Sequence, residues 1–320
     1  MYYNKFHQPE NREIVSLRNI YLEDNIMKNL KLILAILMAA MLLCVGCASA
    51  PANAPAEPAA EEPVAEEPAA EESGEPAAEP AAEGSTPTVD KIKAAGKLVM
   101  LTNAGFAPYE FLGDDNSVIG VDVEIAKAIA AEMGVELEVV DMDFDGIIIA
   151  VQSGKGDLGI AGMTNTEERS QTVDFSVNYV DSLQMIIVPE GSAITGPADL
   201  SGKTVGVQMG TTGDLFVTDS ATGVNVQRYK TGPDAGAELA AGKLDAVVID
   251  AGPAAQIAKA NPGLVVLETP ATDEPEQYAI AIAKGNEDLK TLVDSVLEKL
   301  IADGQIQAWI DEYNVIAAGE

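Results

Sequence analysis

LGIAGMTNTEERSQTVDF, residues 158–175, joins an apolar strand to the start of a helix through a turn of small residues. The apolar run Leu158–Ala161 predicts a buried strand. The turn runs from Gly162 to Thr164, and Thr166 then supplies an oxygen that can cap a helix. Two acidic residues and Arg169 follow in the first helical turn. A strand that ends in such a turn is a common ligand-binding place in α/β proteins.

The groups in this turn fit a carboxylate. Gly162 lets a ligand approach the backbone, and Thr164 offers a hydroxyl. The planar guanidinium of Arg169 can bind a carboxylate through two parallel hydrogen bonds. We therefore interpret the stretch as a carboxylate-binding corner. The alternative is an ordinary surface turn in which Arg169 pairs with Glu167 or Glu168.

The N-terminal region predicts a secreted lipoprotein. Residues 1–26 are polar and of mixed charge, so we expect a misannotated extension before a true start at Met27. The pattern of residues 27–46, a basic start followed by the apolar run Leu32–Val45, is typical of a signal peptide. The apolar run is short for a membrane span. The ending Cys44-Val45-Gly46-Cys47 resembles a bacterial lipobox, in which Cys47 would be lipidated.

Removal of this region limits the chemistry of the mature chain. The one histidine, His7, lies before Met27, Cys44 is lost with the signal peptide, and Cys47 would be blocked by lipid. We therefore expect no His-dependent nucleophilic catalysis, no His-based metal site and no disulfide. We expect no cofactor and no metal ion.

Residues 47–88 form the expected tether. After Cys47 they are rich in Ala, Pro and Glu and contain no Lys or Arg. Such a segment cannot bury enough apolar surface to offset its ordering entropy, and Pro and like charges keep it extended. We expect a disordered spacer between the lipid and a folded domain.

The remaining sequence predicts an α/β domain. The chain holds 51 acidic and 19 basic residues, which argues against nucleic acid and against charge-driven binding to anionic lipid surfaces. Short apolar strands alternate with Ala-rich helical patterns, which favours largely parallel sheets. The strands are KLVML (97–101), ELEVV (136–140), TVGV (204–207), DAVVI (245–249) and LVVL (264–267).

This part of the sequence contains a doubled pattern. One strand leads to Asn103 and a Gly turn, and a second leads to Gln208 and the run GTTG (210–213). Likewise, GKGD (154–157) enters the strand before Gly162, and GKLD (242–245) enters the strand that ends at Asp250. Ligands in α/β sheets lie beyond such strand ends. We therefore expect two similar lobes around one site.

The two lobes would offer complementary walls. One wall would carry Asn103, Gly162 and Arg169, and the other Thr211, Thr212 and Asp250. An Arg opposite an Asp fits the carboxylate and the ammonium group of an α-amino acid. A chance pairing of one Arg with one Asp is the alternative.

Several motifs resemble those of one known family. They are GVDVEIAKAIA (120–130), DFDGI (143–147), QSGKGD (152–157), GMTNTEER (162–169) and VDFS (173–176). From residue 89 to about 314 the chain is similar to the bacterial extracellular solute-binding protein family 3, the polar amino-acid receptors of ABC importers. Val121 departs from the pattern, which more often has an aromatic residue or Leu there.

The resemblance implies an α/β, two-lobed type II periplasmic-binding-protein fold with two crossover strands, near Leu183–Val188 and Gln277–Ile282. Lobe 1 would comprise residues 89–182 and 278–320, lobe 2 residues 187–273, and the hinge residues 183–186 and 274–277. It further implies a monomeric receptor on the outer face of the membrane that closes on an amino acid. An ABC transporter permease, with its ATPase subunits, would be its partner.

Ligand contacts also follow from the resemblance. Gly162 and Thr164 would bind the carboxylate with Arg169, joined by Thr211 or Thr212 at a helix N-terminus. Asp250 would bind the α-ammonium, and Phe106 and Phe144 would flank the ligand side chain.

Selectivity would come from Asn103 and Gln208, which are neutral and can both donate and accept hydrogen bonds. Apart from Asp250, the sequence gives no carboxylate a clear place in the cleft. A buried cation without a partner is costly. We therefore expect a neutral polar amino acid rather than Lys or Arg.

Two other function classes stay open. A secreted dehydratase on the same fold would need a general acid, for which Glu110 or an acid near Glu276 is the candidate. A ligand-sensing receptor subunit is the other. The stretch DMDFDG (141–146) resembles half of a calcium loop, but Gln152 stands where a bidentate Glu is needed, so we expect no calcium site.

Overall fold

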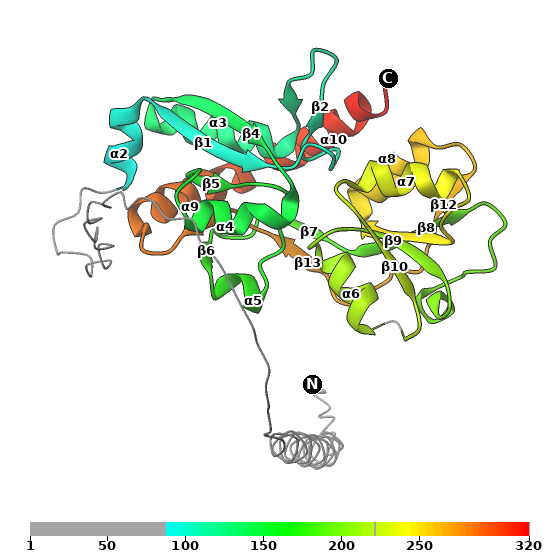
Figure 1. The fold of residues 1–320 in the computed structure, drawn as a ribbon. Coiled ribbons are helices and arrows are strands. Elements are labelled where there is room, and N and C mark those ends of the chain that lie inside the picture. The colour runs from blue at the N-terminus through cyan, green and yellow to red at the C-terminus, as the bar shows by residue number, and fades with distance from the viewer. Residues whose placement is uncertain (1–87, 221, 320) are drawn as a thin grey trace, which may run out of the picture. The chain divides into compact units, whose positions relative to one another are not determined.

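The computed structural model describes residues 88–220 and 222–319 (Figure 1). The expected extension (1–26), signal peptide (27–46) and lipidated Cys47 lie outside these residues, as does the tether except for its last residue. That residue, Thr88, already begins helix α2. In the described part, no helix is both long enough and apolar enough to cross a membrane.

Lobe 1 is built on the sheet β4-β1-β5-β14-β6, in which β14 runs antiparallel to its neighbours. Its first segment contains α2 (Thr88–Ala95), β1 (Lys97–Thr102), β2 (Phe111–Leu112), β3 (Val118–Ile119), α3 (Val121–Met133), β4 (Glu136–Asp141), η2 (Phe144–Gly146), α4 (Ile147–Gln152), β5 (Leu158–Gly159), α5 (Glu167–Ser170) and β6 (Val173–Phe175). Its second segment contains β14 (Ala281–Ala283), α9 (Glu287–Ala302) and α10 (Gln305–Ala317).

Lobe 2 is built on the sheet β10-β9-β11-β8-β12, in which β8 runs antiparallel to its neighbours. Its elements are β8 (Gln184–Pro189), η3 (Pro197–Leu200), β9 (Thr204–Gln208), α6 (Thr212–Ser220), β10 (Asn225–Tyr229), α7 (Gly232–Ala240), β11 (Ala246–Asp250), α8 (Ala251–Ala260) and β12 (Leu264–Val266). The chain alternates between strands and helices as expected, and both sheets are largely parallel.

Two short strands link the lobes (Figure 1). β7 (Val180–Ser182) and β13 (Glu276–Tyr278) pair antiparallel, with Glu276 opposite Ser182. After β7 the chain enters lobe 2 as β8, and after β13 it returns to lobe 1 as β14, so the chain crosses twice between the sheets. Residues 184–186, expected in the hinge, already lie in β8 and pair with β11. The fold is the two-lobed type II binding-protein fold with two crossovers.

Apolar helix faces close the core of lobe 1. α9 begins after Asn286 and buries Leu289, Val293 and Leu297. α3 starts after Gly120, whose φ is 131° and where a Cβ atom would lie 2.1 Å from the Tyr109 carbonyl oxygen. Only glycine fits that junction, which brings the start of α3 close to the turn before β2.

Candidate functional site

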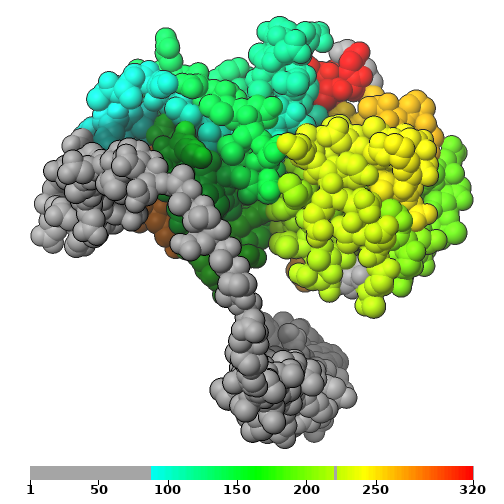
Figure 2. Space-filling model, in the orientation of Figure 1, coloured from blue at the N-terminus to red at the C-terminus, as the bar shows by residue number. Residues whose placement is uncertain are grey.

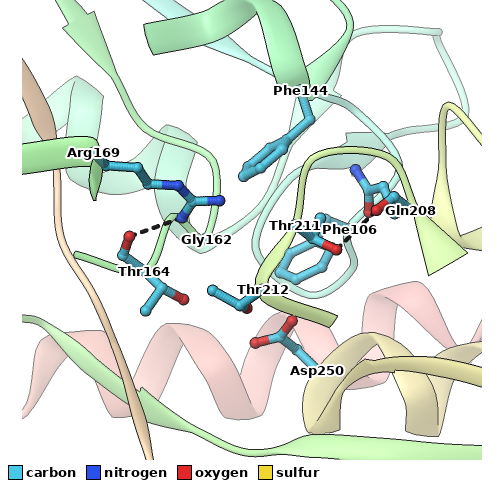
Figure 3. A pocket seen from close by; sticks show the side chains of 9 residues that line it. All are labelled: Phe106, Phe144, Gly162, Thr164, Arg169, Gln208, Thr211, Thr212 and Asp250. Atoms are coloured by element: carbon cyan, nitrogen blue, oxygen red, sulfur yellow. Dashed lines mark hydrogen bonds between the residues drawn. The ribbon is translucent and has the colours of Figure 1, made fainter. Parts of the chain in front are cut away.

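The predicted site residues come together in one pocket between the lobes (Figure 3). Its lining is Phe106, Phe144, Gly162, Thr164, Arg169, Gln208, Thr211, Thr212 and Asp250. The tenth predicted residue, Asn103, is buried and hydrogen-bonded to Gln208. The lining follows the ends of strands β1 and β5 in lobe 1 and β9 and β11 in lobe 2, as the doubled pattern predicts.

The lobes touch across this pocket, so the arrangement is closed. Arg169 of lobe 1 donates to the Gly210 carbonyl of lobe 2 at 3.1 Å. At the rim, Lys230 Nζ lies 2.8 Å from Asp143 Oδ2. On the face shown in Figure 2, the surfaces of the two lobes abut.

Arg169 is held by neutral acceptors. The hydroxyl of Thr166 caps α5 by accepting from the Arg169 backbone N–H, as the sequence predicts. The Arg169 guanidinium donates to the carbonyl oxygens of Thr164, at 2.8 Å, and Gly210, and it lies 5.3 Å from the Phe144 ring centre. Burial lowers its pKa, but an arginine stays protonated.

No carboxylate within residues 88–220 and 222–319 forms an ion pair with Arg169. The surface-turn alternative, which pairs it with Glu167 or Glu168, is therefore not what the structure has. The guanidinium has five N–H donors, and two of them bind the carbonyl oxygens. The others can serve an anion.

Gly162 has a different part from the one expected. Its φ is 51°, and a Cβ atom there would lie 2.5 Å from Phe106 Cε1, so the position requires glycine. Its backbone N–H donates to Asp122 Oδ2 at 2.8 Å and is therefore not available to a carboxylate. The group that Gly162 can offer a ligand is its carbonyl oxygen, which accepts and so suits an ammonium group. The expectation that Gly162 binds a carboxylate is wrong for that reason.

Asp250 is the buried anion of lobe 2. It ends β11 and is 4% exposed. Its Oδ1 accepts from the Tyr278 hydroxyl at 2.6 Å, and its Oδ2 accepts from Gln184 Nε2 at 2.7 Å. Burial, and to a smaller extent the charge of Glu276, raises the pKa of Asp250 to about 6. A cation in the pocket would offset the free-energy cost of burying the ionised Asp250 carboxylate.

The threonines of lobe 2 stand at the start of α6. The hydroxyl of Thr211 donates to the Gln208 carbonyl and accepts from the Asp214 N–H. The hydroxyl of Thr212 donates to Glu276 Oε2 at 2.6 Å. The first backbone N–H groups of a helix have no partner within it, so this end of α6 can bind an anion beside Arg169.

The end of the pocket away from Thr164 is aromatic and amide-lined (Figure 3). Phe106 and Phe144 lie there, together with Gln208. Gln208 Nε2 donates to Asn103 Oδ1 at 2.9 Å, and Asn103 in turn donates to the Met142 carbonyl at 2.7 Å. The Gln208 Oε1 atom is buried and has no hydrogen-bond partner in the described part of the protein. It is an acceptor that a donor on a ligand could satisfy.

The ligand contacts expected from the sequence include neither Glu276 nor Gln184. Glu276 Oε2 accepts from the hydroxyls of Thr164 and Thr212, and from Gln184 Nε2 at 3.1 Å. Gln184 Nε2 also donates to Asp250. A second carboxylate therefore lies next to the pocket lining, and the expectation of a neutral ligand did not take it into account. No local pattern marks Glu276, which lies in a short polar stretch.

Glu110 does not line the pocket. It is 1% exposed, and burial, followed by the charge of the adjacent Asp122, raises the pKa of Glu110 well above its usual value. Asp122 holds the Gly162 N–H and accepts from the Tyr179 hydroxyl at 2.9 Å. Glu110 therefore lies behind the pocket wall, next to the carboxylate that accepts from the Gly162 N–H. In the described ranges, no cluster of three or more His, Cys, Asp or Glu side chains could hold a metal ion.

The chain is similar to known binding proteins over this whole two-lobed part. Over 227 residues it is 30% identical to the L-cystine-binding protein TcyJ of Escherichia coli, covering 70% of this chain and 85% of that one. Over 214 residues it is 36% identical to the arginine-binding extracellular protein ArtP of Bacillus subtilis, covering 66% and 83%.

A solved structure matches the fold as well. The arginine-bound form of truncated ArgBP from T. maritima has a TM-score of 0.63 and 43% identity, and the match covers 66% of this chain and 99% of that one. Residues 98–315 match the profile of the bacterial extracellular solute-binding proteins, family 3. The chain belongs to the bacterial extracellular solute-binding proteins of family 3.

Proposed function

We propose that this protein binds an L-α-amino acid between its lobes. The observation that carries the proposal is the presence of Arg169 and Asp250 in one pocket, supplied by opposite lobes and not paired with each other. Arg169 binds the ligand carboxylate together with the backbone at Thr164 and the start of α6. Asp250 and the Gly162 carbonyl bind the ammonium group.

The bound amino acid carries a cationic side chain, and arginine is the first candidate. One cation, Arg169, and one carboxylate, Asp250, line the pocket. A second carboxylate, Glu276, lies directly behind the lining, where it accepts from the hydroxyl of Thr212 and adds to the effect of burial in raising the pKa of Asp250. A neutral amino acid leaves one negative charge unbalanced, whereas an arginine balances it. Phe106 and Phe144 offer ring faces to a guanidinium, and Gln208 Oε1 offers an acceptor. ArtP and ArgBP, by their names, bind arginine.

The protein serves as the receptor of an ABC importer rather than as an enzyme. The relatives named above are binding proteins, and Glu110, one of the two candidate acids for catalysis, does not line the pocket. The lobes close on the ligand, and the closed form docks on a permease that works with ATPase subunits. Lipid on Cys47 anchors the monomeric receptor to the outer face of the membrane through the tether.

Calorimetric titration of the purified protein with arginine and with citrulline, its neutral analogue of nearly the same shape, tests the ligand class. We expect arginine to bind at least about tenfold more tightly, because only arginine balances the second carboxylate. Glutamine, lysine, histidine and cystine complete the series. Tighter binding of glutamine or citrulline than of arginine would reject a cationic ligand. Absence of binding by every amino acid would reject the receptor function itself.

A further inference from the structure

Glu276 stands where both lobes and the linking strands meet. It is the first residue of β13, which pairs with β7. A single oxygen, Oε2, accepts from Thr164 Oγ1 at 2.9 Å and from Thr212 Oγ1 at 2.6 Å. Thr164 belongs to lobe 1 and Thr212 to lobe 2.

One carboxylate cannot keep both bonds when the lobes separate. Thr164 is tied to β13 by a bridge with Tyr278, so it stays beside Glu276 if lobe 2 swings away. Thr212 is the first residue of helix α6 and moves with lobe 2. Opening therefore breaks the 2.6 Å bond from Thr212 and exposes a carboxylate that this hydroxyl had satisfied. Bonds to an ionised acceptor are stronger than neutral ones, so this contact favours the closed form.

The same oxygen is linked to the anion of lobe 2. Gln184 Nε2 lies 3.1 Å from Glu276 Oε2 and 2.7 Å from Asp250 Oδ2, so one amide group joins the two carboxylates. The Tyr278 hydroxyl, also on β13, holds the other oxygen of Asp250 at 2.6 Å. Asp250 is thus held through Gln184, which also bonds to Glu276, and through Tyr278 of the linking strand.

We propose that Glu276 is a positioning residue that clasps the two lobes, stabilises the closed form and orients Asp250 in that form. The proposal rests on the proposed function only in that the lobes close on an amino acid. It assigns to Glu276 a role that charge alone does not supply, because the clasp also depends on the reach of the carboxylate to both threonines.

Glu276→Asp separates the clasp from the charge. Aspartate keeps the negative charge but is one methylene shorter, so it cannot reach both hydroxyls. Glu276→Gln removes the charge and keeps the length. Glu274→Gln is the matched control, because Glu274 is exposed and lies two residues away. Affinities for arginine and citrulline are measured by calorimetry. The distance between the lobes without ligand is measured by double electron–electron resonance. The two spin labels are placed at exposed Lys155 and Gln227, in the full chain with Cys44 and Cys47 changed to Ser.

We expect E276D to weaken arginine and citrulline by the same factor, about tenfold, and to shift the ligand-free distances toward an open form. In E276D the ratio of arginine affinity to citrulline affinity stays the same as in the unchanged protein. E276Q lowers the ratio, and E274Q changes nothing. Wild-type affinities and distances in E276D would overturn the clasp. A loss confined to arginine in E276Q, with citrulline unaffected in both variants, would also overturn it. If the unchanged protein binds no amino acid, the proposed function fails while the distances still decide the clasp.

Discussion

The two lobes share one strand order but present opposite charges to the pocket. The sheet order β4-β1-β5-β14-β6 of lobe 1 matches β10-β9-β11-β8-β12 of lobe 2, position by position. The third strand in each order is β5 in lobe 1 and β11 in lobe 2. The chain after β5 leads to Arg169, whereas β11 ends at Asp250. In the second, β1 leads to Asn103 and β9 ends at Gln208, and these two amides bond to each other.

The difference shows how a doubled architecture recognises a ligand without symmetry. Equivalent strand ends meet across the pocket, so a pair of positions can bind the two ends of one molecule. The charges differ in how they are held. Arg169 sits on a four-residue helix and binds only carbonyl oxygens, whereas Asp250 is fixed by a tyrosine and a glutamine in a fully buried place. Lobe 2 therefore bears the greater cost of burying charge.

Arg169→Lys is expected to reduce ligand binding the most. Lysine keeps the charge but loses the planar fork, so it cannot hold two carbonyl oxygens and a carboxylate at once. We expect the affinity for every amino acid to fall by about 4 kcal/mol, roughly a thousandfold. Calorimetry measures the loss, and the unfolding midpoint without ligand serves as the control for the fold. Affinity within tenfold of the original would show that Arg169 does not bind the carboxylate.

Asp250→Asn removes the charge of lobe 2. We expect binding to weaken by about 2–3 kcal/mol, roughly a hundredfold, because the ammonium group loses its anion. The new amide can donate to Gln184 Oε1, which is buried and has no partner in the described protein. Asp245→Asn, one residue before the opposite end of the same strand, is the control and should bind normally.

The same variant changes stability in the opposite direction. The pKa of Asp250 is raised from 3.8 to about 6, so its contribution to stability is full below pH 3.8 and is lost as pH rises through 6. At pH 7 without ligand, D250N should be more stable by about 1–3 kcal/mol. Its stability should also fall less between pH 4 and 7. Asp122, whose pKa is also raised to about 6, keeps part of the slope. Denaturant unfolding at several pH values measures this, and an equal slope in both proteins would contradict it.

The local parts of this site could be predicted from the sequence. Apolar runs punctuated by glycine and aspartate mark β9 and β11, and they mark the Gly162 turn after β5, because such signals depend on near neighbours. The capping of α5 by Thr166 could be predicted for the same reason. The doubled pattern then indicates which strand ends face each other.

The rest depends on contacts between distant residues. The Gly162 N–H is taken by Asp122, 40 residues earlier, so the part of Gly162 in binding could not be read locally. Glu276 enters the site because three-residue strands pair across the hinge, with Gln277 opposite Asp181. Strands so short carry no periodicity, and the net charge of the site changes with that one residue.

Gln208→Glu tests the part that the two facing amides, Gln208 and Asn103, play in selectivity. It adds a negative charge at the aromatic end of the pocket, where Gln208 Oε1 has no partner in the described protein. We expect the ratio of arginine to citrulline affinity to rise by about tenfold, because the charge favours only the cationic side chain. Gln227→Glu makes the same change on the exposed face of β10 and should leave the ratio alone. A falling ratio in Q208E would place the ligand side chain elsewhere.

Lys230→Met tests an exposed ion pair between the lobes. Lys230 and Asp143 form an ion pair across the rim, and both side chains are about half exposed or more. Exposed ion pairs stabilise little and are screened by salt, so we expect arginine affinity to fall by only about twofold to threefold at low salt, and by less at 0.5 M salt. Lys243→Met removes a pair of the same kind that lies within lobe 2, with Glu238, and should have no effect. Since Lys243 and Glu238 never separate when the lobes move, a similar loss in both variants would mean that net charge, rather than contact between the lobes, sets the change.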